Sequence, residues 1–330
     1  MQEYKICRRC IMDTSDPEIV FDENGCCNHC SRALKLLDTP PISLSAEEKE
    51  KSLKALVDKI KVKGKNKKYD CIIGVSGGVD STYAAYLVKK NGLNPLAVHL
   101  DNGWNSRIAV TNIEKTLKKL DIDLYTHVID WEEFKDLQLS FLKASTPDSE
   151  VPSDHAIQAL LYETAARYKV QYILAGTNIT SESILPKAWS QGHSDWKYIK
   201  SVQKKFGTAR LKTFPHYGIL RLFRNIVVRK IKYISILNYV NYAKEDAKKF
   251  LMDELGWEDY GGKHYESVYT HFYQSFILPK KFGFDKRRAH LSSLIMAGQL
   301  TREEALEEMK KPAISDEMAR SEEEYVISKF

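Results

Sequence analysis

Short apolar runs alternate with helical spacings in the first half of the chain. The runs read as buried strands, and they lie at residues 69–75, 95–100, 123–129 and 170–175. Apolar residues at helical spacing predict helices over 80–91, 107–120, 131–143 and 154–168. Strands that alternate with helices predict βαβ units. We therefore expect an α/β fold, a doubly wound parallel sheet covered by helices on both faces.

The pattern changes beyond Gly176. Residues 215–330 contain few strand-like runs and several helical ones. Thr301 and Glu304 have the spacing of a capping box that opens a helix. This part of the chain is therefore expected to be mainly helical.

The start of the chain differs from both. Residues 39–45 read as a linker, and Ser45 is placed to cap a polar, lysine-rich helix that ends near Gly64. We expect three parts, namely a cysteine-rich module at 1–38, an α/β domain at 45–185 and a helical region for substrate or partner at 186–330.

The composition is that of a globular protein. Of the 330 residues, 43% are hydrophobic and 28% are charged, so a sizeable core can form without disulfides. The opening residues lack the apolar run of a signal peptide. Residues 219–240 are interrupted by five basic side chains and are not suited to span a bilayer. We expect a cytoplasmic protein with no insertion across a membrane.

Basic residues gather in one stretch, although the net charge is only +6. No acidic residue lies between Asp195 and Glu245, a stretch that carries Lys197, Lys200, Lys204, Lys205, Arg210, Lys212, Arg221, Arg224, Arg229, Lys230, Lys232 and Lys244. Its positive field would attract phosphate or an acidic surface. Nucleic acid, a nucleotide-linked substrate and an acidic partner protein are compatible with it, as is a solvated face on a pair of long helices.

A glycine-rich turn joins the first predicted strand to the helix that follows. It consists of Ser76, Gly77, Gly78, Val79, Asp80 and Ser81. The glycines let the backbone turn sharply and approach an anion, while the helix presents unpaired N–H groups and the positive end of its dipole. The two serines add hydroxyl donors. This order of strand, turn and helix predicts a phosphate site.

Asp80 is the unusual member of this loop, because a carboxylate repels phosphate unless a cation lies between them. Mg²⁺ is the natural cation. A Walker A loop is excluded, since no Lys follows Gly78 at the required offset, and the dinucleotide motif Gly-x-Gly-x-x-Gly is absent. A plain strand-to-helix turn is the remaining alternative.

Five of the six cysteines lie in the first 30 residues. Cys7 with Cys10 and Cys27 with Cys30 form two Cys-x-x-Cys pairs at the spacing of a zinc ribbon. Four thiolates would complete the coordination of Zn²⁺, so we expect a structural site. Cys26 could replace Cys27. Incidental cysteines and a three-cysteine iron–sulfur cluster are the alternatives.

The loop resembles that of the N-type ATP pyrophosphatases, which include GMP, asparagine and NAD synthetases and tRNA-modifying adenylating enzymes. The resemblance implies an adenine nucleotide alpha hydrolase-like fold whose loop holds the pyrophosphate of ATP. A carbonyl oxygen is adenylated, and a nucleophile then displaces AMP. Two further strand ends match ATP-side positions of the superfamily, one with His99 and Asp101, the other with Gly176 and Thr177.

Nearly the whole chain resembles the N-acetyl sugar amidotransferases of bacterial surface-polysaccharide synthesis. The resemblance rests on segments 7–14, 74–81, 261–267 and 280–292. It implies that the acetamido group of a nucleotide-activated sugar becomes an acetamidino group for lipopolysaccharide (O-antigen) or nonulosonic acid synthesis. The implied catalytic candidates are Asp80, Ser81, Lys281 and His290, and the implied substrate-binding candidates are Lys263, His264, Arg287 and Arg288. Apart from the two loop residues, each could instead be a surface charge or a satisfied polar residue.

Ammonia is the expected nucleophile. Sulfur-transfer members need a cysteine near ATP, but no cysteine follows Cys71, which reads as a core residue of a buried strand. The chain offers no cysteine with a credible His partner, nor the initial cysteine of an N-terminal glutaminase. We therefore expect a separate glutaminase subunit. The resemblance adds a second partner, like the ammonia-channelling cyclase barrel of histidine biosynthesis.

Two other functions stay open. A tRNA-modifying adenylating enzyme would also combine a zinc ribbon, this loop and an aromatic-rich basic stretch, although nucleic acid is the less favoured partner. A non-catalytic subunit that binds ATP to scaffold a glutaminase is the third hypothesis.

Overall fold

A five-stranded parallel sheet forms the centre of the computed structural model, which describes residues 3–262 and 265–330. The strands run in the order β3-β2-β1-β4-β5, and every neighbouring pair is parallel. They are β1 (Cys71–Gly74), β2 (Pro95–Asp101), β3 (Asp123–Val128), β4 (Tyr172–Ala175) and β5 (Lys232–Ser235). Four lie at the predicted apolar runs. The fifth was missed because this edge strand is short, half exposed and begins with a lysine.

Residues distant in sequence combine into two units. The sheet unit comprises Ala46–Thr177 and Gly192–Ser267. The cysteine unit comprises Met1–Ser45, Asn178–Gln191 and Val268–Phe330. The three-part division at 1–38, 45–185 and 186–330 stays a prediction.

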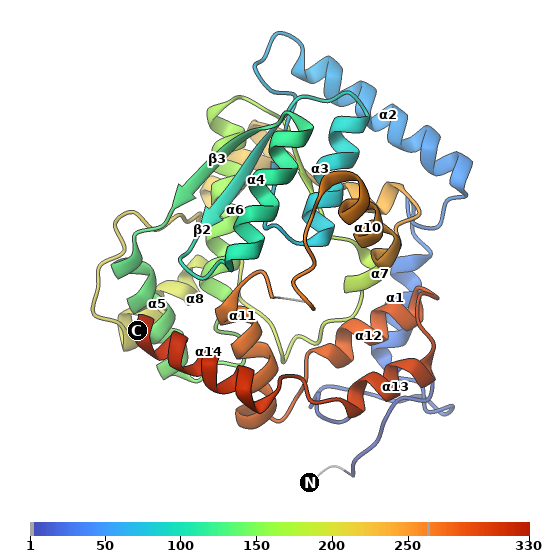
Figure 1. Ribbon diagram of the computed structural model, residues 1–330, viewed down its shortest axis with the longest axis vertical. Helices are drawn as coiled ribbons and strands as arrows, with labels where there is room; N and C mark the ends of the chain where they lie inside the picture. Colours follow the sequence, from blue (N-terminus) through green and yellow to red (C-terminus); the bar gives the residue numbers. More distant parts are fainter. Residues whose placement is uncertain (1–2, 263–264) are drawn as a thin grey trace. The chain divides into compact units, whose positions relative to one another are not determined.

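Helices cover both faces of the sheet (Figure 1). Cys71 and Ile73 of β1 share a core with apolar residues of α2 (Ala46–Gly64), α3 (Val79–Lys90) and α4 (Arg107–Leu120). Alternate residues face the other side, where Leu161 of α6 (Val151–Arg167) lies over Gly74. This period of two is that of a strand buried on both faces. The doubly wound α/β fold is therefore confirmed.

The basic stretch of the sheet unit forms short elements, so the pair of long helices was wrong. Its basic side chains are nevertheless exposed, apart from the half-buried Lys244. Residues Gly207, Gly218 and Pro215 interrupt it. The remaining elements of the unit are α5 (Trp131–Ala144), α8 (Trp196–Phe206), α9 (Ile219–Phe223), the π-helical η1 (Arg224–Val228), the 3₁₀ turn η2 (Ile236–Tyr239), α10 (Lys244–Phe250) and the π-helical η3 (Leu251–Leu255).

The cysteine unit is helical apart from its first residues. Its elements are α1 (Asn28–Leu37), α7 (Ile179–Glu182), α11 (Val268–Phe272), the π-helical η4 (Tyr273–Phe282), α12 (Arg287–Met296), α13 (Arg302–Lys310) and α14 (Asp316–Lys329). Helix α12 packs against α1, α7 and α13 (Figure 1). The capping box at Thr301 and Glu304 is present at the start of α13, as predicted.

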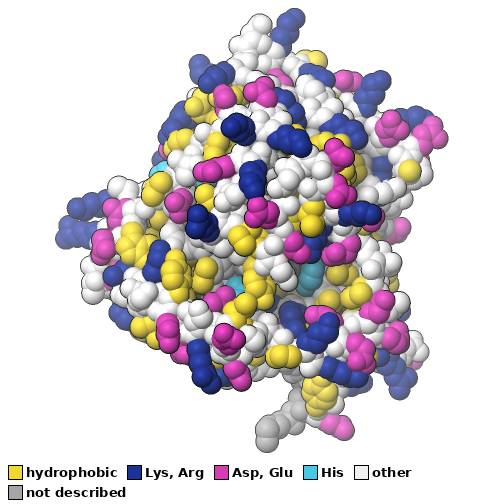
Figure 2. Space-filling model, viewed as in Figure 1, with side chains coloured by type: hydrophobic (Ala, Val, Ile, Leu, Met, Phe, Trp, Pro, Cys, Tyr) yellow, Lys and Arg dark blue, Asp and Glu magenta, His cyan; other side chains and the backbone are white. Residues whose placement is uncertain are grey.

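Charges of both signs cover the molecular face seen in Figure 2, where Lys and Arg side chains are interspersed with Asp and Glu. A membrane-crossing helix would need a long apolar span. Within residues 3–262 and 265–330, no helix has the length and apolar character for that.

Candidate functional site

The loop Ser76–Ser81 joins β1 to α3 at the carboxyl ends of the parallel strands. Gly77 has a φ of +82°, and a Cβ atom there would lie 2.4 Å from the carbonyl oxygen of Ala109. Only glycine fits such a position. Gly78 is the N-cap of α3 and provides no capping side chain, so the first N–H groups of the helix face the loop.

The two serines of the loop lie side by side. Their Oγ atoms are 3.1 Å apart, and the backbone N–H of Ser76 donates to the Ser81 hydroxyl at 3.2 Å. The Ser81 hydroxyl lies 3.1 Å from the carbonyl oxygen of Gly78 and can donate to it. Ser76 is exposed. The hydroxyl groups thus converge at the solvent-accessible end of the turn.

Asp80 is held by two residues from far along the chain. The hydroxyl of Tyr242 donates a hydrogen bond to one carboxylate oxygen, and Nζ of Lys244 lies 4.0 Å from the other. Gly176 lies close to the backbone of Asp80, since a Cβ atom on this glycine would lie 2.6 Å from the Asp80 carbonyl oxygen. Close packing at Gly176 therefore fixes the first turn of α3 beneath the loop.

A later segment of the sheet unit lines the loop from another side. The indole Nε1 of Trp257 donates to the Gly77 carbonyl at 2.9 Å. Tyr260 and Glu266 come next to Gly78, and the Tyr260 oxygen hydrogen-bonds the backbone N–H of Val79. Burial raises the pKa of Tyr260, so its hydroxyl stays protonated.

This lining segment contains the 261–267 motif that carried the sequence resemblance. Of its predicted substrate residues, Lys263 and His264 lie outside the described residues. Sequence reasoning missed Tyr242, Lys244, Trp257 and Tyr260. Only Lys244 had a signal, its place in the basic stretch.

The predicted ATP-side residues lie at the carboxyl ends of β2 and β4, the two strands that flank β1. His99 is buried, with Nδ1 donating to the Val75 carbonyl at 3.0 Å and Nε2 accepting from Asn105 at 3.1 Å. Asp101 accepts a second hydrogen bond from the Asn105 amide at 3.3 Å. At the end of β4 the Thr177 hydroxyl lies 2.7 Å from that of Ser235. The assignment of these residues to ATP stays a prediction.

Four cysteine side chains converge in the cysteine unit: Cys7, Cys10, Cys27 and Cys30. All are fully buried, and their Sγ atoms lie within 4.8 Å of one another. The Cys7–Cys30 and Cys10–Cys27 Sγ separations are both 3.7 Å, close to the edge of about 3.8 Å of a tetrahedron with zinc–sulfur bonds of about 2.3 Å. Cys26 is only half-buried and lies outside the cluster.

Thiols packed this closely compete for negative charge. Hydrogen bonds from neighbouring thiols, Cys10 first, lower the pKa of Cys7, whereas the interaction with Cys10 raises the pKa of Cys30. All four can ionise together only around a cation. Backbone N–H groups of Cys10 and Cys27 already point at the Cys7 sulfur, at 3.5 and 3.2 Å. The donor set therefore fits a structural Zn²⁺.

Helices α12 and α13 hold the first cysteine segment in place. The Arg288 guanidinium forms an ion pair with Asp13 and donates to the Ile11 carbonyl. Arg302 donates to the carbonyl oxygens of Cys7 and Cys10, at 3.0 and 3.1 Å. Arg288, a predicted substrate residue, thus has internal partners within this unit.

The other predicted residues of this unit have different surroundings. Arg287 makes a two-pronged contact with Asp285, with Nη2 2.7 Å from a carboxylate oxygen. Nδ1 of His290 donates to the Ser181 carbonyl at 3.0 Å. Lys281 is exposed on η4. The roles of Arg287, His290 and Lys281 stay predictions.

Comparison with known proteins separates the chain into two matched parts. Residues 47–214 match the NAD synthase family, which is half of the chain. The chain belongs to the NAD synthase family. Residues 266–330 match the C-terminal domain of proteins like the LPS biosynthesis protein WbpG. Together the matches confirm the predicted resemblance, an N-type ATP pyrophosphatase that continues into a segment like those of lipopolysaccharide biosynthesis proteins.

Two relatives match the chain over different lengths. The uncharacterized protein MJ1599 of Methanocaldococcus jannaschii is 25% identical over 321 residues, covering 94% of this chain and 95% of that protein. The tRNA-specific 2-thiouridylase MnmA 2 of Clostridium botulinum is 29% identical over 107 residues, which cover 29% of this chain and 30% of that protein.

Two synthetases of known structure align with part of the chain. NMN synthetase from Francisella tularensis has a TM-score of 0.34 and 17% identity over 64% of this chain and 87% of its own. The NH3-dependent NAD synthetase from Campylobacter jejuni has a TM-score of 0.34 and 15% identity over 64% and 84%.

A member of the NAD synthase family uses ATP, and its ligase-type chemistry calls for Mg²⁺. The loop suits both. Mg²⁺ prefers oxygen ligands, which the Asp80 carboxylate and the hydroxyls of Ser76 and Ser81 supply. The N–H groups at the start of α3 suit the phosphates. We conclude that the sheet unit is an ATP-utilising domain.

Proposed function

We propose that the protein is an ATP-dependent amidotransferase that converts the acetamido group of a nucleotide-activated sugar into an acetamidino group. The observation that carries the proposal is the pairing of a phosphate loop in the sheet unit with a C-terminal segment like that of LPS biosynthesis proteins. Membership of the NAD synthase family supports the use of ATP, and the segment at residues 266–330 supports a sugar as the acceptor.

The proposed reaction has two steps. The amide oxygen of the sugar attacks the α-phosphorus of ATP, and the bond to pyrophosphate breaks. Ammonia then adds to the activated carbon, AMP leaves with the former amide oxygen, and loss of a proton gives the amidine. The N–H groups of Gly77, Gly78 and Val79 and the hydroxyls of Ser76 and Ser81 would stabilise charge on the departing pyrophosphate. Asp80 would hold Mg²⁺, which would supply positive charge beside the departing pyrophosphate.

ATP would extend from this loop along the sheet edge. His99 and Asp101 would border the adenosine from β2, and Gly176 and Thr177 would lie at the same edge of the sheet on the other side of β1. Because Tyr260 occupies the Val79 N–H, a phosphate oxygen must replace the tyrosine oxygen when ATP binds.

The acceptor side of the proposal uses residues from the resemblance. Lys281 and His290 are the catalytic candidates, and Lys263, His264, Arg287 and Arg288 are the candidates for the sugar nucleotide. A substrate contact predicts that an alanine substitution raises KM for the sugar nucleotide without changing KM for ATP. An equal effect on both would indicate a structural role.

Ammonia is proposed to come from a separate glutaminase, with a cyclase-like barrel protein as its channel. In the described residues, the thiol nearest in sequence to the loop is that of Cys71, which is fully buried. Burial raises its pKa, and a neutral thiol is a poor nucleophile. Four of the other five cysteines form the cluster, and Cys26 also belongs to the cysteine unit. The described residues of the sheet unit therefore offer no suitable thiol for glutamine hydrolysis.

The test uses ATP, Mg²⁺, ammonium chloride and a panel of UDP- and CMP-linked acetamido sugars, analysed by mass spectrometry. We expect one sugar to yield AMP and a product lighter by one mass unit. Glutamine should replace ammonium only after a glutaminase is added. Release of AMP without any lighter sugar would contradict the sugar assignment while keeping the ATP chemistry.

A second candidate is a tRNA-modifying adenylating enzyme, favoured by the 107-residue match to a 2-thiouridylase and by the basic stretch. The buried Cys71 weighs against thiolation. Filter binding of tRNA at rising salt separates the two functions, because phosphate contacts give a steep salt dependence. Tight, salt-sensitive tRNA binding together with tRNA-dependent AMP formation would favour this candidate.

A further inference from the structure

A short helical segment of the sheet unit turns apolar side chains to the solvent. It comprises α9 and η1, residues 219–228. Its exposed apolar residues are Ile219 (80%), Leu220 (82%), Phe223 (58%), Ile226 (46%), Val227 (52%) and Val228 (66%). Apolar residues gathered on the surface in this way usually mark a contact site.

The segment is held by its polar residue rather than by its apolar ones. Asn225 is buried, and its carbonyl accepts from the Ile231 N–H at 3.0 Å. Its side-chain oxygen accepts from Arg229 at 2.7 Å. Ile219, Phe223 and Val227 are spaced by four residues, so they share one helix face. This face is turned outward, with the exposed Arg221 and Arg224 in the same helix.

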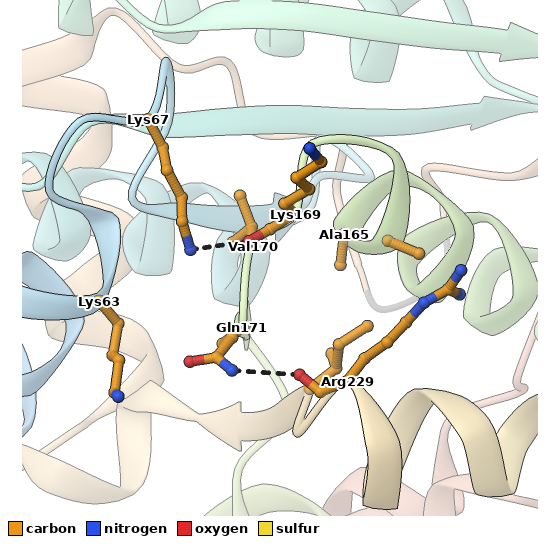
Figure 3. A pocket seen from close by; sticks show the side chains of 9 residues that line it. Lys63, Lys67, Ala165, Lys169, Val170, Gln171 and Arg229 are labelled. Atoms are coloured by element: carbon orange, nitrogen blue, oxygen red, sulfur yellow. Dashed lines mark hydrogen bonds between the residues drawn. The ribbon is translucent and has the colours of Figure 1, made fainter.

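A basic hollow begins where this segment ends (Figure 3). It has a volume of about 270 Å³ and is surrounded by the side chains of Lys63, Lys67, Lys169 and Arg229. Lys67 donates to the Lys169 carbonyl at 2.7 Å, which leaves two of its ammonium protons for a ligand. The lining contains no acidic side chain. Four basic residues in the lining give the hollow a positive field that suits a phosphate group.

The hollow and the ATP loop occupy opposite edges of the sheet. Val170, Gln171 and Ile231 line the hollow just before β4 and β5 begin, whereas the loop follows the end of β1. Parallel strands place these positions at opposite edges. The basic hollow is therefore separate from the proposed nucleotide site.

We propose that this face is a peripheral contact with an anionic phospholipid membrane. Ile219, Leu220 and Phe223 would enter the boundary between headgroups and acyl chains, as apolar faces of interfacial helices do. The arginines beside them and the hollow would receive lipid phosphates, because basic residues near an anionic surface strengthen binding. The segment lies on the membrane and does not cross it.

Charge argues against a second copy of the chain as occupant. A two-fold contact would place the basic side chains of one copy against those of the other. An acidic protein would satisfy the charges, but protein interfaces centre on Trp, Tyr or Arg anchors seated in pockets. Five of the six exposed residues here are aliphatic. The combination with a phosphate-sized hollow favours a lipid surface.

The test is sedimentation of the full chain with vesicles of phosphatidylcholine, alone or mixed equally with phosphatidylglycerol. We expect binding to the mixed vesicles only, and weakening at high salt. Leu220→Ser with Phe223→Ser should reduce the bound fraction at least about tenfold. Lys63→Gln with Lys169→Gln should reduce it several-fold. Val128→Ser, at an exposed valine on β3 (70%), is the control that should bind normally.

Three results would overturn the proposal: no binding to mixed vesicles, equal binding to neutral ones, or binding that survives the Leu220 and Phe223 changes. Binding of inorganic phosphate without vesicle binding would assign the hollow to a free anion. Displacement of the vesicles by a purified acidic protein would show that the face is a contact site for a protein. Thermal melting of each variant verifies that it is folded. AMP formation without vesicles tests the proposed function separately.

Discussion

Arg288 lies against Asp13, with its Nε atom 3.1 Å from a carboxylate oxygen. The same guanidinium donates to the Ile11 carbonyl at 2.7 Å, and Tyr4 donates to the Asp13 carboxylate at 3.0 Å. The side chains of the pair are only 15% and 3% exposed. A residue near the end of the chain therefore fixes the segment that carries the first cysteine pair.

Removing one partner of this pair should be costly, because the other charge stays buried. We expect Arg288→Ala to lower the free energy of unfolding of the cysteine unit by about 3–5 kcal/mol, measured by urea denaturation. Lys310→Ala, which removes an exposed pair with Glu307, should leave it unchanged. A loss below about 1 kcal/mol in Arg288→Ala would mean that the pair does not fasten the segment.

The cysteine cluster predicts one Zn²⁺ per chain, measured by elemental analysis of the purified protein. Cys27→Ser should abolish binding, because it removes a ligand of a four-coordinate site. Cys26→Ser should retain the metal, since Cys26 lies outside the cluster. Iron in place of zinc would contradict the assignment of the metal, and loss of zinc from Cys26→Ser would show that the ligand set is wrong.

Tyr242 is predicted to orient the carboxylate of Asp80. Hydrogen bonds to charged groups contribute about 1.5–3 kcal/mol, so Tyr242→Phe should lower kcat/KM for ATP by about tenfold or more. The loss should be smaller at high Mg²⁺ concentration if the carboxylate holds that ion. The matched control is Tyr239→Phe in η2. Equal activities in both variants would exclude the orienting role.

His155 should make stability depend on pH. It is fully buried, its Nδ1 donates to the His193 carbonyl at 2.8 Å, and its Nε2 accepts from the Tyr217 N–H at 3.2 Å. Burial lowers the pKa of His155, because the charged imidazolium would lose its hydration there. A protonated Nε2 would also be unable to accept the hydrogen bond from the Tyr217 N–H.

Below about pH 6.5, His155 therefore binds a proton in the unfolded protein that it does not bind in the folded protein. The free energy of unfolding should fall by up to about 1.4 kcal/mol per pH unit there, and His155 should contribute no slope above it. Urea denaturation at pH 7.5 and 5.5 should show a smaller difference for His155→Phe than for the parent. His193→Gln should keep the parent's difference. If His155→Phe showed the same difference in unfolding free energy between the two pH values as the parent, His155 would not be the source of the pH dependence.

Contiguous features could be predicted from the sequence. The loop 76–81 lies between a buried strand and a helix, and the two Cys-x-x-Cys pairs have a recognisable spacing. The strands β1, β2 and β4 stood out because both their faces are buried, which gives continuous apolar runs. The edge strand β3 is largely exposed, yet it was also predicted, at residues 123–129. The exception, β5, is a half-exposed edge strand whose few apolar residues resemble those of a loop.

Contacts made by tertiary packing could not be predicted. Tyr242, Trp257 and Tyr260 reach the loop from segments far along the chain, and no local spacing reveals that. The same holds for Arg288, whose motif suggested a substrate contact but whose guanidinium binds Asp13 and Ile11. The basic stretch could be recognised from its composition. The exposure of the apolar residues in 219–228 could not, because it depends on which other segments pack against them.

The central claim, that the loop grips the pyrophosphate of ATP during adenylation, is tested most directly by measuring AMP and pyrophosphate side by side. The parent protein, supplied with Mg²⁺, ammonium and an accepted sugar nucleotide, should form the two in equal amounts. Asp80→Ala should lower both at least about 100-fold, whereas Lys89→Ala at the far end of α3 should lower neither. Formation of ADP and phosphate instead, or full activity in Asp80→Ala, would contradict the account.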